Sequence, residues 1–328
     1  MSTLDVGGPR QRSPRVIVEQ PTQIDRWFDR VTLWSGMAVL VLLALVGLFL
    51  LLRSRQALDV SGIWRFLTRD GWRTDVHPPR IGVLGLLTGT VLVAITAIAM
   101  ALPLGVTAAL YITEYASARA RRYLTALVDL LAAIPSLLYG VWGAYVLAPQ
   151  VAPLSRWLGK HLGFIPIFKI DSGAGATRTI FIAGIVVSFM TLPIIASVVR
   201  EVFAQTPPGE KEAALALGAT KWGMIKAVVL PFGRGGIIGG TMLGLGRALG
   251  ETIAVTLLLP QVPTTFFHIF QDGGATVSGF IVRRAGSDTF TTSGLMAAGL
   301  VLFLLTLATN VIASVVVSRS RSGAGVEL

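Results

Sequence analysis

The chain contains no cysteine, and only three of its 328 residues are histidine. The absence of cysteine excludes both a disulfide framework and a thiolate metal site. The three histidines, His77, His161 and His268, lie far apart in polar segments and form no cluster with metal-ligand spacing. The sequence therefore predicts no metal site in this chain.

Charged residues are also scarce. They make up 14% of the chain, and hydrophobic residues make up 53%, whereas soluble domains average about 25% charged and about 45–50% apolar residues. Lys and Arg number 28 and bring the net charge to +11, but they are spread among loops and tails and form no basic face interleaved with aromatics. This pattern indicates loops that meet lipid headgroups rather than a nucleic-acid site.

Motifs for catalysis are missing as well. The chain has no G-x-x-x-x-G-K-[ST] sequence, and its glycine-rich piece at 173–176 has no lysine after it. No nucleophile, base and orienting group occur together in a recognisable pattern. The sequence predicts a chain that is not an enzyme and does not itself hydrolyse ATP.

Long apolar runs, in contrast, are abundant. Crossing a bilayer takes about 20 residues of α-helix. We predict an all-α, polytopic membrane protein with six transmembrane helices, at residues 31–52, 81–112, 123–147, 179–199, 235–259 and 293–317. Pro103, Pro135 and Pro193 are expected to kink the second, third and fourth of these helices.

The polar segments between the runs define the organisation of the chain. It divides into an N-terminal tail (1–30), the first span (31–52), an extracytoplasmic loop (53–80), a five-helix core (81–318) and a C-terminal tail (319–328). The tail is no signal peptide, because the first apolar run begins only at Val31. Six spans place both termini on one side. Lys and Arg divide almost evenly between the two sides, so the positive-inside rule only weakly favours cytoplasmic termini, and Arg53, Arg55 and Arg65 oppose it.

The core contains a polar loop at 200–226 with a distinctive sequence. It reads Glu212-Ala213-Ala214-Leu215-Ala216-Leu217-Gly218 and, after nine residues, reaches Val228 and then Leu230-Pro231. Residues 207–217 include good helix formers, and Gly218 suits the left-handed residue that ends a helix. Composition alone predicts a short helix here, which could be either an ordinary interfacial helix or a docking element.

The fifth span contains both an arginine and a glutamate. Gly240, Gly244, Arg247 and Glu251 fall at i, i+4, i+7 and i+11, which predicts one stripe on one helix. The glycines would let a neighbouring helix approach, so that the charged pair faces the bundle interior. A charge at mid-bilayer costs at least about 2.5–3.5 kcal/mol, so the pair is a functional candidate. The alternative is a mutual ion pair that holds the bundle together.

The chemistry of this pair limits which substrate the chain could transport. Arginine donates two parallel hydrogen bonds to an oxyanion and keeps its charge. A carboxylate repels a fully ionised anion, but it can accept a hydrogen bond from an anion that still carries a proton. Phosphate carries one near neutral pH, since its second pKa is about 6, whereas sulfate does not. The hypothesis is that Arg247 binds the charge of phosphate and Glu251 accepts a hydrogen bond from its protonated oxygen.

Three segments resemble one known family. The loop at 200–226 resembles the EAA loop of ABC importer permeases, with Val228 in place of an isoleucine. The sequence Arg-Ala-Leu-Gly-Glu-Thr at 247–252 resembles the RALGET segment of the phosphate ABC permeases of the Pst system. Residues 133–136 and 139–143 resemble the third span of the PstC branch of that system more than that of its PstA branch.

The resemblance implies a type I ABC importer permease of the MetI-like fold. It implies that Arg247 and Glu251 lie on the phosphate path, and that the loop at 200–226 and both termini are cytoplasmic. The residues that it assigns to a coupling helix, which docks on a separate ATPase, are Glu212, Ala213, Ala214 and Gly218.

The resemblance also implies partners. These are a PstA-like permease that pairs with this chain, a dimer of a PstB-like ATPase that binds ATP and Mg²⁺, a PstS-like extracytoplasmic phosphate-binding protein and the cytoplasmic membrane itself. No cofactor is expected in this chain. Two alternatives remain: an ABC permease for another oxyanion, such as sulfate or molybdate, and a secondary transporter in which Glu251 carries a coupling proton. Co-purification of a stoichiometric ATPase separates the ABC permeases from the secondary transporter.

Overall fold

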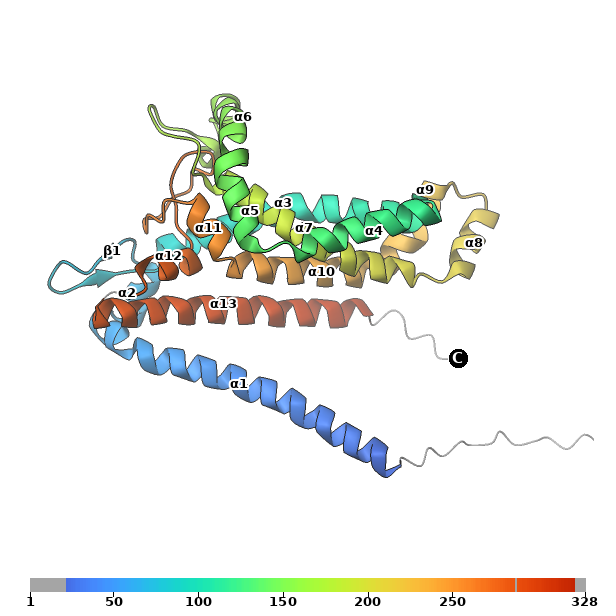
Figure 1. Ribbon diagram of the computed structural model, residues 1–328, viewed down its shortest axis with the longest axis horizontal. Helices are drawn as coiled ribbons and strands as arrows, with labels where there is room; N and C mark the ends of the chain where they lie inside the picture. The colour runs from blue at the N-terminus through green and yellow to red at the C-terminus, as the bar shows by residue number, and fades with distance from the viewer. Residues whose placement is uncertain (1–21, 287, 322–328) are drawn as a thin grey trace, which may run out of the picture. The chain divides into compact units, whose positions relative to one another are not determined.

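The computed structural model describes residues 22–286 and 288–321, and most of them are helical. The long helices are α1 (Gln23–Ser61), α3 (Leu84–Leu110), α7 (Ile180–Ala204), α10 (Leu230–Gly250) and α13 (Thr289–Arg321) (Figure 1). The shorter α-helices are α2 (Ile63–Thr68), α4 (Ala118–Ala133), α5 (Ser136–Trp142), α6 (Ala148–Leu162), α8 (Pro208–Ala216), α9 (Lys221–Met224), α11 (Ile253–Leu258) and α12 (Val277–Arg284). The π-helical segments η1 (Tyr111–Tyr115), η2 (Gly143–Leu147) and η4 (Ile225–Val229) join neighbouring helices, and η3 (Pro166–Phe168) is a 3₁₀ turn.

The predicted all-α class is confirmed. In the described residues the exception is a hairpin of two short strands, β1 (Trp72–Arg73) and β2 (Arg80–Ile81), which pair antiparallel with Trp72 opposite Ile81. This hairpin lies between α2 and α3, outside the long helices.

The chain divides into two compact units, residues 1–48 and 49–328. The described part of the first unit is the beginning of α1, whose apolar side chains are exposed along its length. A reciprocal cap fixes the start of α1: the Thr22 N–H and hydroxyl donate to the Asp25 carboxylate at 2.8 and 2.7 Å, and the Asp25 N–H donates to the Thr22 hydroxyl at 3.3 Å. The tail expected at 1–30 is therefore helical from Gln23 onward, and residues 1–21 lie outside the described part of the chain.

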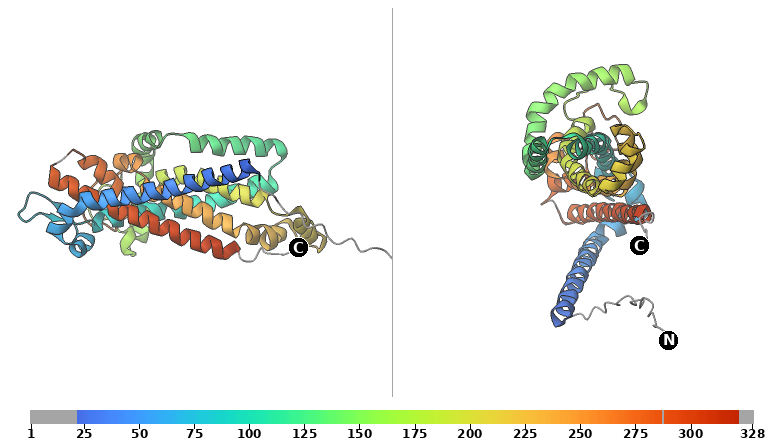
Figure 2. Two further views of the ribbon diagram at one scale, coloured as in Figure 1. Left: turned by 90° about the horizontal axis from the view of Figure 1, so that it is seen from below. Right: turned by 90° about the vertical axis from the view of Figure 1, so that its right-hand side faces the viewer.

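In the second unit, α7 is the central helix. It packs along α3, α10 and α4, and α13 packs along α10; these helices run side by side in Figures 1 and 2. Small and β-branched residues line the contact between α3 and α7, and Val93, Ala97, Ala183 and Val187 are at most 1% exposed. Small side chains let helices approach closely in a bilayer, where packing and hydrogen bonds hold them together.

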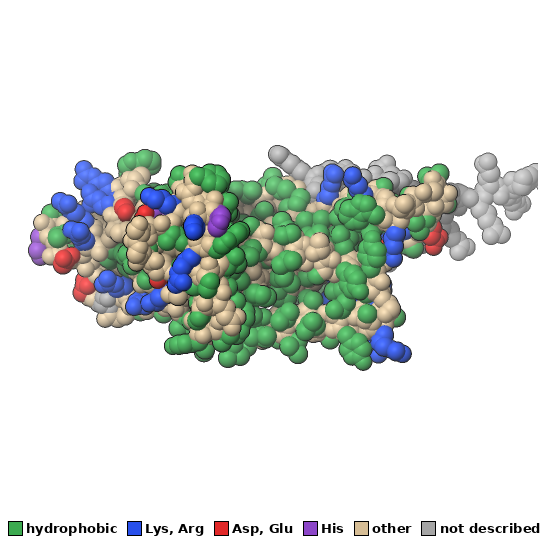
Figure 3. All heavy atoms as spheres, turned by 90° about the horizontal axis from the view of Figure 1, so that it is seen from above, with side chains coloured by type: hydrophobic (Ala, Val, Ile, Leu, Met, Phe, Trp, Pro, Cys, Tyr) green, Lys and Arg blue, Asp and Glu red, His purple; other side chains and the backbone are tan. Residues whose placement is uncertain are grey.

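Six helical segments are long and apolar enough to cross a membrane, which confirms the predicted number of spans. They are Gln23–Ser61, Leu84–Tyr115, Ser136–Leu162, Ile180–Ala204, Lys221–Gly250 and Thr289–Val316. On the face in Figure 3, a broad apolar band separates two ends where charged side chains gather. The chain is a multi-pass membrane protein. Because α13 continues to Arg321, the tail expected at 319–328 begins in helix, and residues 322–328 lie outside the described part.

The third span does not follow the expected 123–147. The chain turns at Ile134 and Pro135, whose ψ angles are 128° and 139°, because the residue before a proline is driven out of the helical region. α4 ends there, and α5, η2 and α6 form a new helical run from Ser136. In Figure 1, α6 runs crosswise to the long helices. The segment at 148–178, between the third and fourth predicted spans, therefore begins with a helix.

The loop expected at 53–80 also begins with helix. α1 continues past its apolar run to Ser61. Ser293, near the start of α13, holds the last turns of α1 in place. The Ser293 hydroxyl donates to the Arg53 carbonyl at 2.8 Å and accepts from the Ala57 N–H at 3.1 Å. Ala57 is fully buried in a cluster with Phe66. Contacts with α13 thus keep a polar segment helical.

Candidate coupling and transport sites

The loop at 200–226 contains the short helix that the sequence predicts. α8 starts after Pro207 and ends before Gly218, whose φ of +86° is left-handed. The Ala219 N–H donates to the Ala214 carbonyl at 3.1 Å and closes the turn. Both the helix and the left-handed glycine are confirmed.

One surface of α8 is exposed. Glu212 and Ala213 are accessible, whereas Ala214 is half-buried against a cluster of α3 and α7 residues. Large apolar side chains that follow α8 in the chain also stay exposed: Leu217 is 89% exposed, and Trp222, in α9, is 58% exposed. An exposed apolar patch beside charged groups is typical of an interaction surface.

An ion pair connects α8 to the end of α3. Lys211 Nζ lies 2.6 Å from Glu114 Oε1, and the Glu114 side chain is only 7% exposed. Glu114 stands in η1, the π-helical extension of α3. Sequence reasoning missed this pair, because the two residues lie 97 positions apart and no spacing rule connects them. The one available signal is a carboxylate at the end of an apolar run.

A cavity of about 470 Å³ opens beside this ion pair. The charged residues in its lining are Glu114, Arg121, Arg200, Glu201 and Lys211. Arg121 donates from Nε to the Ile112 carbonyl at 3.0 Å and from Nη2 to the Thr113 carbonyl at 2.9 Å. It therefore caps the C-terminal end of the helix that α3 and η1 form together. Arg200 Nη2 lies 3.9 Å from Asp129. Because charges of both signs line the cavity, it offers no strong field for an anion.

The stripe expected in the fifth span is interrupted before Glu251. Gly240, Gly244 and Arg247 lie on α10, which ends at Gly250. Glu251 has φ of −63° and ψ of 130°, so it lies outside that helix. The prediction of one continuous helix through all four residues is wrong. Gly250 favours the break because glycine is a poor helix former.

The buried side chain of Glu251 supports the next helix. Its Oε1 accepts a hydrogen bond from the Ala254 N–H at 3.3 Å, in the first turn of α11. The Ser278 hydroxyl donates to the Glu251 carbonyl at 2.6 Å and ties the break to α12. A carboxylate at a helix N-terminus satisfies a free N–H and is favoured by the helix dipole. These two contacts fix Glu251 at the start of α11.

Arg247 is exposed in the single chain. Within the residues that the structure describes, no carboxylate oxygen lies within 4.0 Å of its guanidinium, so the alternative of an ion pair with Glu251 is not realised. Arg247 does lie close enough to Tyr139 to interact with it electrostatically, and the Tyr139 hydroxyl donates to the Leu131 carbonyl at 3.0 Å. The guanidinium therefore remains available for a ligand.

Gly240 and Gly244 are buried where α10 packs on α7. A Cβ at Gly244 would lie 3.0 Å from Ile195 Cγ1, and a Cβ at Gly240 would lie 3.4 Å from the Ile195 carbonyl oxygen. A larger side chain at Gly244 would force the helices apart. The close approach of α10 to α7 thus depends on the missing side chain at Gly244, whereas a Cβ at Gly240 would make an ordinary van der Waals contact.

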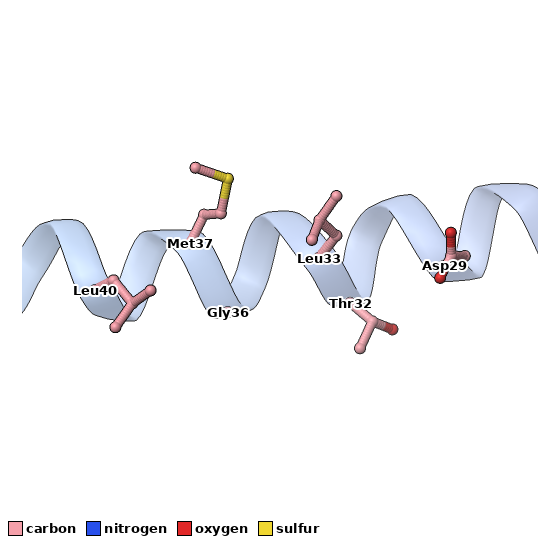
Figure 4. A pocket seen from close by; sticks show the side chains of 6 residues that line it. All are labelled: Asp29, Thr32, Leu33, Gly36, Met37 and Leu40. Atoms are coloured by element: carbon pink, nitrogen blue, oxygen red, sulfur yellow. The ribbon is translucent and has the colours of Figure 1, made fainter. Parts of the chain in front are cut away.

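Two other features of the described residues were candidates for a metal or a small-molecule site, and neither fits one. Among these residues no group of three or more His, Asp or Glu could hold a metal ion. A hollow of about 470 Å³ lies along α1 beside Gly36. Its polar lining residues are Asp29 and Thr32, and Figure 4 shows that their side chains point to different sides of the helix. Without convergent polar groups the hollow is not a ligand pocket.

Comparisons with known proteins define the class of this molecule. The family described as "Binding-protein-dependent transport system inner membrane component" matches residues 101–322. The inward-facing MetNI methionine ABC transporter has a similar structure, with a TM-score of 0.50 and 18% identity over 73% of this chain and 94% of that chain. A bacterial ABC transporter involved in alginate import matches with a TM-score of 0.50 and 19% identity, over 72% and 79% of the two chains. The class is therefore that of ABC importer permeases with a MetI-like fold.

Curated relatives narrow the class to one family. The phosphate transport system permease protein PstC 2 of Mycobacterium tuberculosis is 40% identical over 302 residues, which are 91% of this chain and 93% of that protein. PstC of Mycobacterium leprae is 41% identical over 270 residues, 81% and 85% of the two chains. PstC of Mesorhizobium japonicum is 35% identical over 334 residues, 99% and 100% of the two chains. The chain belongs to the PstC family of phosphate transport system permeases.

Proposed function

We propose that this chain is the membrane-spanning permease subunit of an ATP-driven importer, and that it moves inorganic phosphate from a binding protein across the cytoplasmic membrane. The observation that carries the proposal is the 40% identity to a phosphate permease over 91% of the chain. The permease itself is not catalytic, and ATP is hydrolysed on a separate partner chain.

In this proposal Arg247 and Glu251 contact the phosphate. The Arg247 guanidinium has no carboxylate partner in the described residues, so it can donate two parallel hydrogen bonds to the anion. Glu251 Oε1 accepts from the Ala254 N–H, and Oε2 is left to accept from the protonated oxygen of phosphate. The break after Gly250 supports this role, because it lets the carboxylate turn independently of α10.

We also assign the coupling role to α8. Its exposed apolar patch beside Glu212 and Ala213 suits a groove on a cytoplasmic ATPase dimer of the PstB type. Gly218 supports the assignment, since its left-handed turn fixes the direction in which α8 leaves the bundle. The loop at 200–226 and both termini are then cytoplasmic, a PstA-like permease is the membrane partner, and a PstS-like protein delivers phosphate from the outside.

The test is uptake of labelled phosphate by proteoliposomes that contain the whole purified complex. Arg247→Ala should lower ATP-dependent uptake by about tenfold or more, the effect of losing a hydrogen bond from a charged group. Arg234→Ala is the matched control, because it removes another exposed cation from α10 and should leave uptake unchanged.

Three outcomes would contradict the proposal. Unchanged uptake in Arg247→Ala would remove this residue from the path. Transport by an active complex that contains no ATPase subunit would indicate a secondary transporter instead. Faster uptake of sulfate or molybdate than of phosphate would assign the permease to another oxyanion.

A further inference from the structure

A cleft of about 250 Å³ lies between the last turns of α1 and the first turns of α13, and the transport function does not use it. Its lining residues are Phe49, Arg53, Gln56, Thr289, Thr292, Ser293 and Met296, all in the second unit. They form a stripe on each helix, since the positions on α1 are four and three residues apart and those on α13 are three, one and three apart. Two facing stripes make a continuous groove.

The boundaries of the apolar runs put the groove at the level of the lipid headgroups. Arg53 directly follows the apolar run that ends at Leu52, and the sixth span begins at Thr289. Phe49 and Met296 therefore lie on the side of the hydrocarbon, whereas Arg53 and Thr289 lie on the side of the water. The lining is therefore apolar where the acyl chains of a phospholipid would lie and polar where its headgroup would lie.

The walls of the groove are held in place. The Ser293 hydroxyl bridges the Arg53 carbonyl at 2.8 Å and the Ala57 N–H at 3.1 Å, so α1 and α13 are joined beside the groove. Ala57 is completely buried, and Ser54 is too. The groove is therefore part of the folded unit.

Among the residues that the structure describes, the cation in this groove, Arg53, has no acidic side chain within ion-pair distance. The Arg53 guanidinium carbon lies 5.9 Å from the centre of the Phe49 ring, so the side chain turns back along α1 toward the hydrocarbon. No carboxylate oxygen in the described residues lies within 4.0 Å of it, and no residue of the lining is acidic.

We propose that this groove binds one anionic phospholipid with a hydroxylated headgroup, of the phosphatidylglycerol type. The phosphate accepts hydrogen bonds from the Arg53 guanidinium. The headgroup hydroxyls meet the Gln56 amide and the Thr289 hydroxyl, and an acyl chain passes Phe49 and Met296. A zwitterionic headgroup fits less well, because the lining offers no carboxylate to its ammonium group. The assignment of the lipid to the outer leaflet rests on the proposed topology; the site itself does not.

Native mass spectrometry of the whole purified complex tests the proposal by titration with phosphatidylglycerol and, separately, with phosphatidylcholine. Arg53→Gln should weaken the binding of phosphatidylglycerol by about tenfold, as expected for one hydrogen bond from a charged group, and phosphatidylcholine should bind more weakly to the unaltered complex. Arg55→Gln is the matched control: it removes an exposed cation two residues along α1 that is not part of the lining, so binding should be unchanged.

Each other result would overturn the proposal. An equal loss in Arg53→Gln and Arg55→Gln would indicate general attraction to surface charge, and no loss in either would exclude Arg53 as a ligand. Competition by inorganic phosphate as strong as that by the lipid would make this a site for the free anion. A complex that retains no lipid here, with Arg53 protected from arginine-modifying reagents, would show that a helix of a partner subunit fills the groove. Phosphate uptake by both variants serves as the check on folding.

Discussion

Glu251 has two roles, one for each oxygen of its carboxylate. Oε1 accepts from the Ala254 N–H and stabilises the start of α11, while we propose that Oε2 accepts a hydrogen bond from phosphate. Burial alone makes a carboxylate expensive in the membrane. A position at a helix N-terminus offsets part of that cost, because the dipole and the free N–H favour negative charge.

The substitution Glu251→Gln separates the two tasks. The amide oxygen can still accept from the Ala254 N–H, so α11 should form and the thermal stability of the complex should change little. The NH₂ group cannot accept a hydrogen bond from a protonated phosphate oxygen, so ATP-dependent phosphate uptake should fall by about tenfold. Glu251→Ala is the comparison that loses both tasks and should lower stability too. Unchanged uptake and an unchanged preference for phosphate over sulfate in Glu251→Gln would contradict the role.

Some of the important residues can be recognised from the sequence alone, and others cannot. Arg247 and Glu251 are conspicuous because a charge inside an apolar run needs a reason. The contact between Lys211 and Glu114 has no such signal, since only the tertiary fold, in which α8 packs on α9 and η4, brings the two residues together. The break after Gly250 was also hidden, because glycines occur throughout this span and nothing in the sequence marks Gly250 as the one where the helix ends.

At the scale of elements, the link between α8 and α3 is the feature most relevant to coupling. α8 is a short helix with an exposed outer surface, and the ion pair between Lys211 and Glu114 holds it to the membrane bundle. A force that an ATPase applies to α8 would therefore reach η1 through this contact. The pair is a positioning device and does not touch the phosphate.

Glu114→Gln should weaken this link. Removing one partner of a fully buried ion pair costs about 3–5 kcal/mol, but Lys211 is 21% exposed and can turn toward water. We therefore expect a smaller loss of stability, about 1–3 kcal/mol, measured by thermal unfolding of the complex. ATP hydrolysis should become less dependent on the loaded binding protein. Glu210→Gln removes an exposed carboxylate of α8, the helix that contains Lys211, and is the control that should change neither quantity. If the two variants behave alike, α8 is held in some other way.

The packing of α10 on α7 gives a second prediction at this scale. Gly244→Leu would place a Cβ 3.0 Å from Ile195 Cγ1 and its larger side chain beyond. Overpacking of a close helix contact typically costs about 1–3 kcal/mol, so the melting temperature and the yield of folded complex should drop. Gly239→Leu makes the same change on the same helix where a Cβ meets no atom within 4 Å, and should be better tolerated. Equal effects would mean that Gly244 does not set the helix distance.

The number of spans could be predicted from apolar runs because lipid imposes their length. Their boundaries could not, because helices continue where tertiary contacts support them. α1 extends to Ser61 through Ser293, and α6 continues a helix through a segment whose composition resembles a loop. Pro135 was expected to kink a single span, but together with Ile134 it turns the chain into a separate helical run.

For the whole molecule, orientation depends on very few groups. The cations are nearly balanced between the two sides, so cytoplasmic termini follow mainly from the resemblance of the loop at 200–226 to a coupling element. The proposed phosphate direction, the ATPase-facing side and the outer leaflet of the lipid site all share this one assignment. A direct measurement of sidedness therefore tests several conclusions together.

The absence of cysteine makes that measurement clean, because the unaltered chain gives no background in thiol labelling. Asp75 and Arg119 are both exposed, and lie in polar segments that the proposed topology puts on opposite sides. In intact spheroplasts, a membrane-impermeant maleimide should label Asp75→Cys but not Arg119→Cys. After permeabilisation both should react. The opposite pattern would reverse the topology and move α8 away from a cytoplasmic ATPase. Labelling of both positions before permeabilisation would contradict an odd number of membrane crossings between them, which α3 provides here.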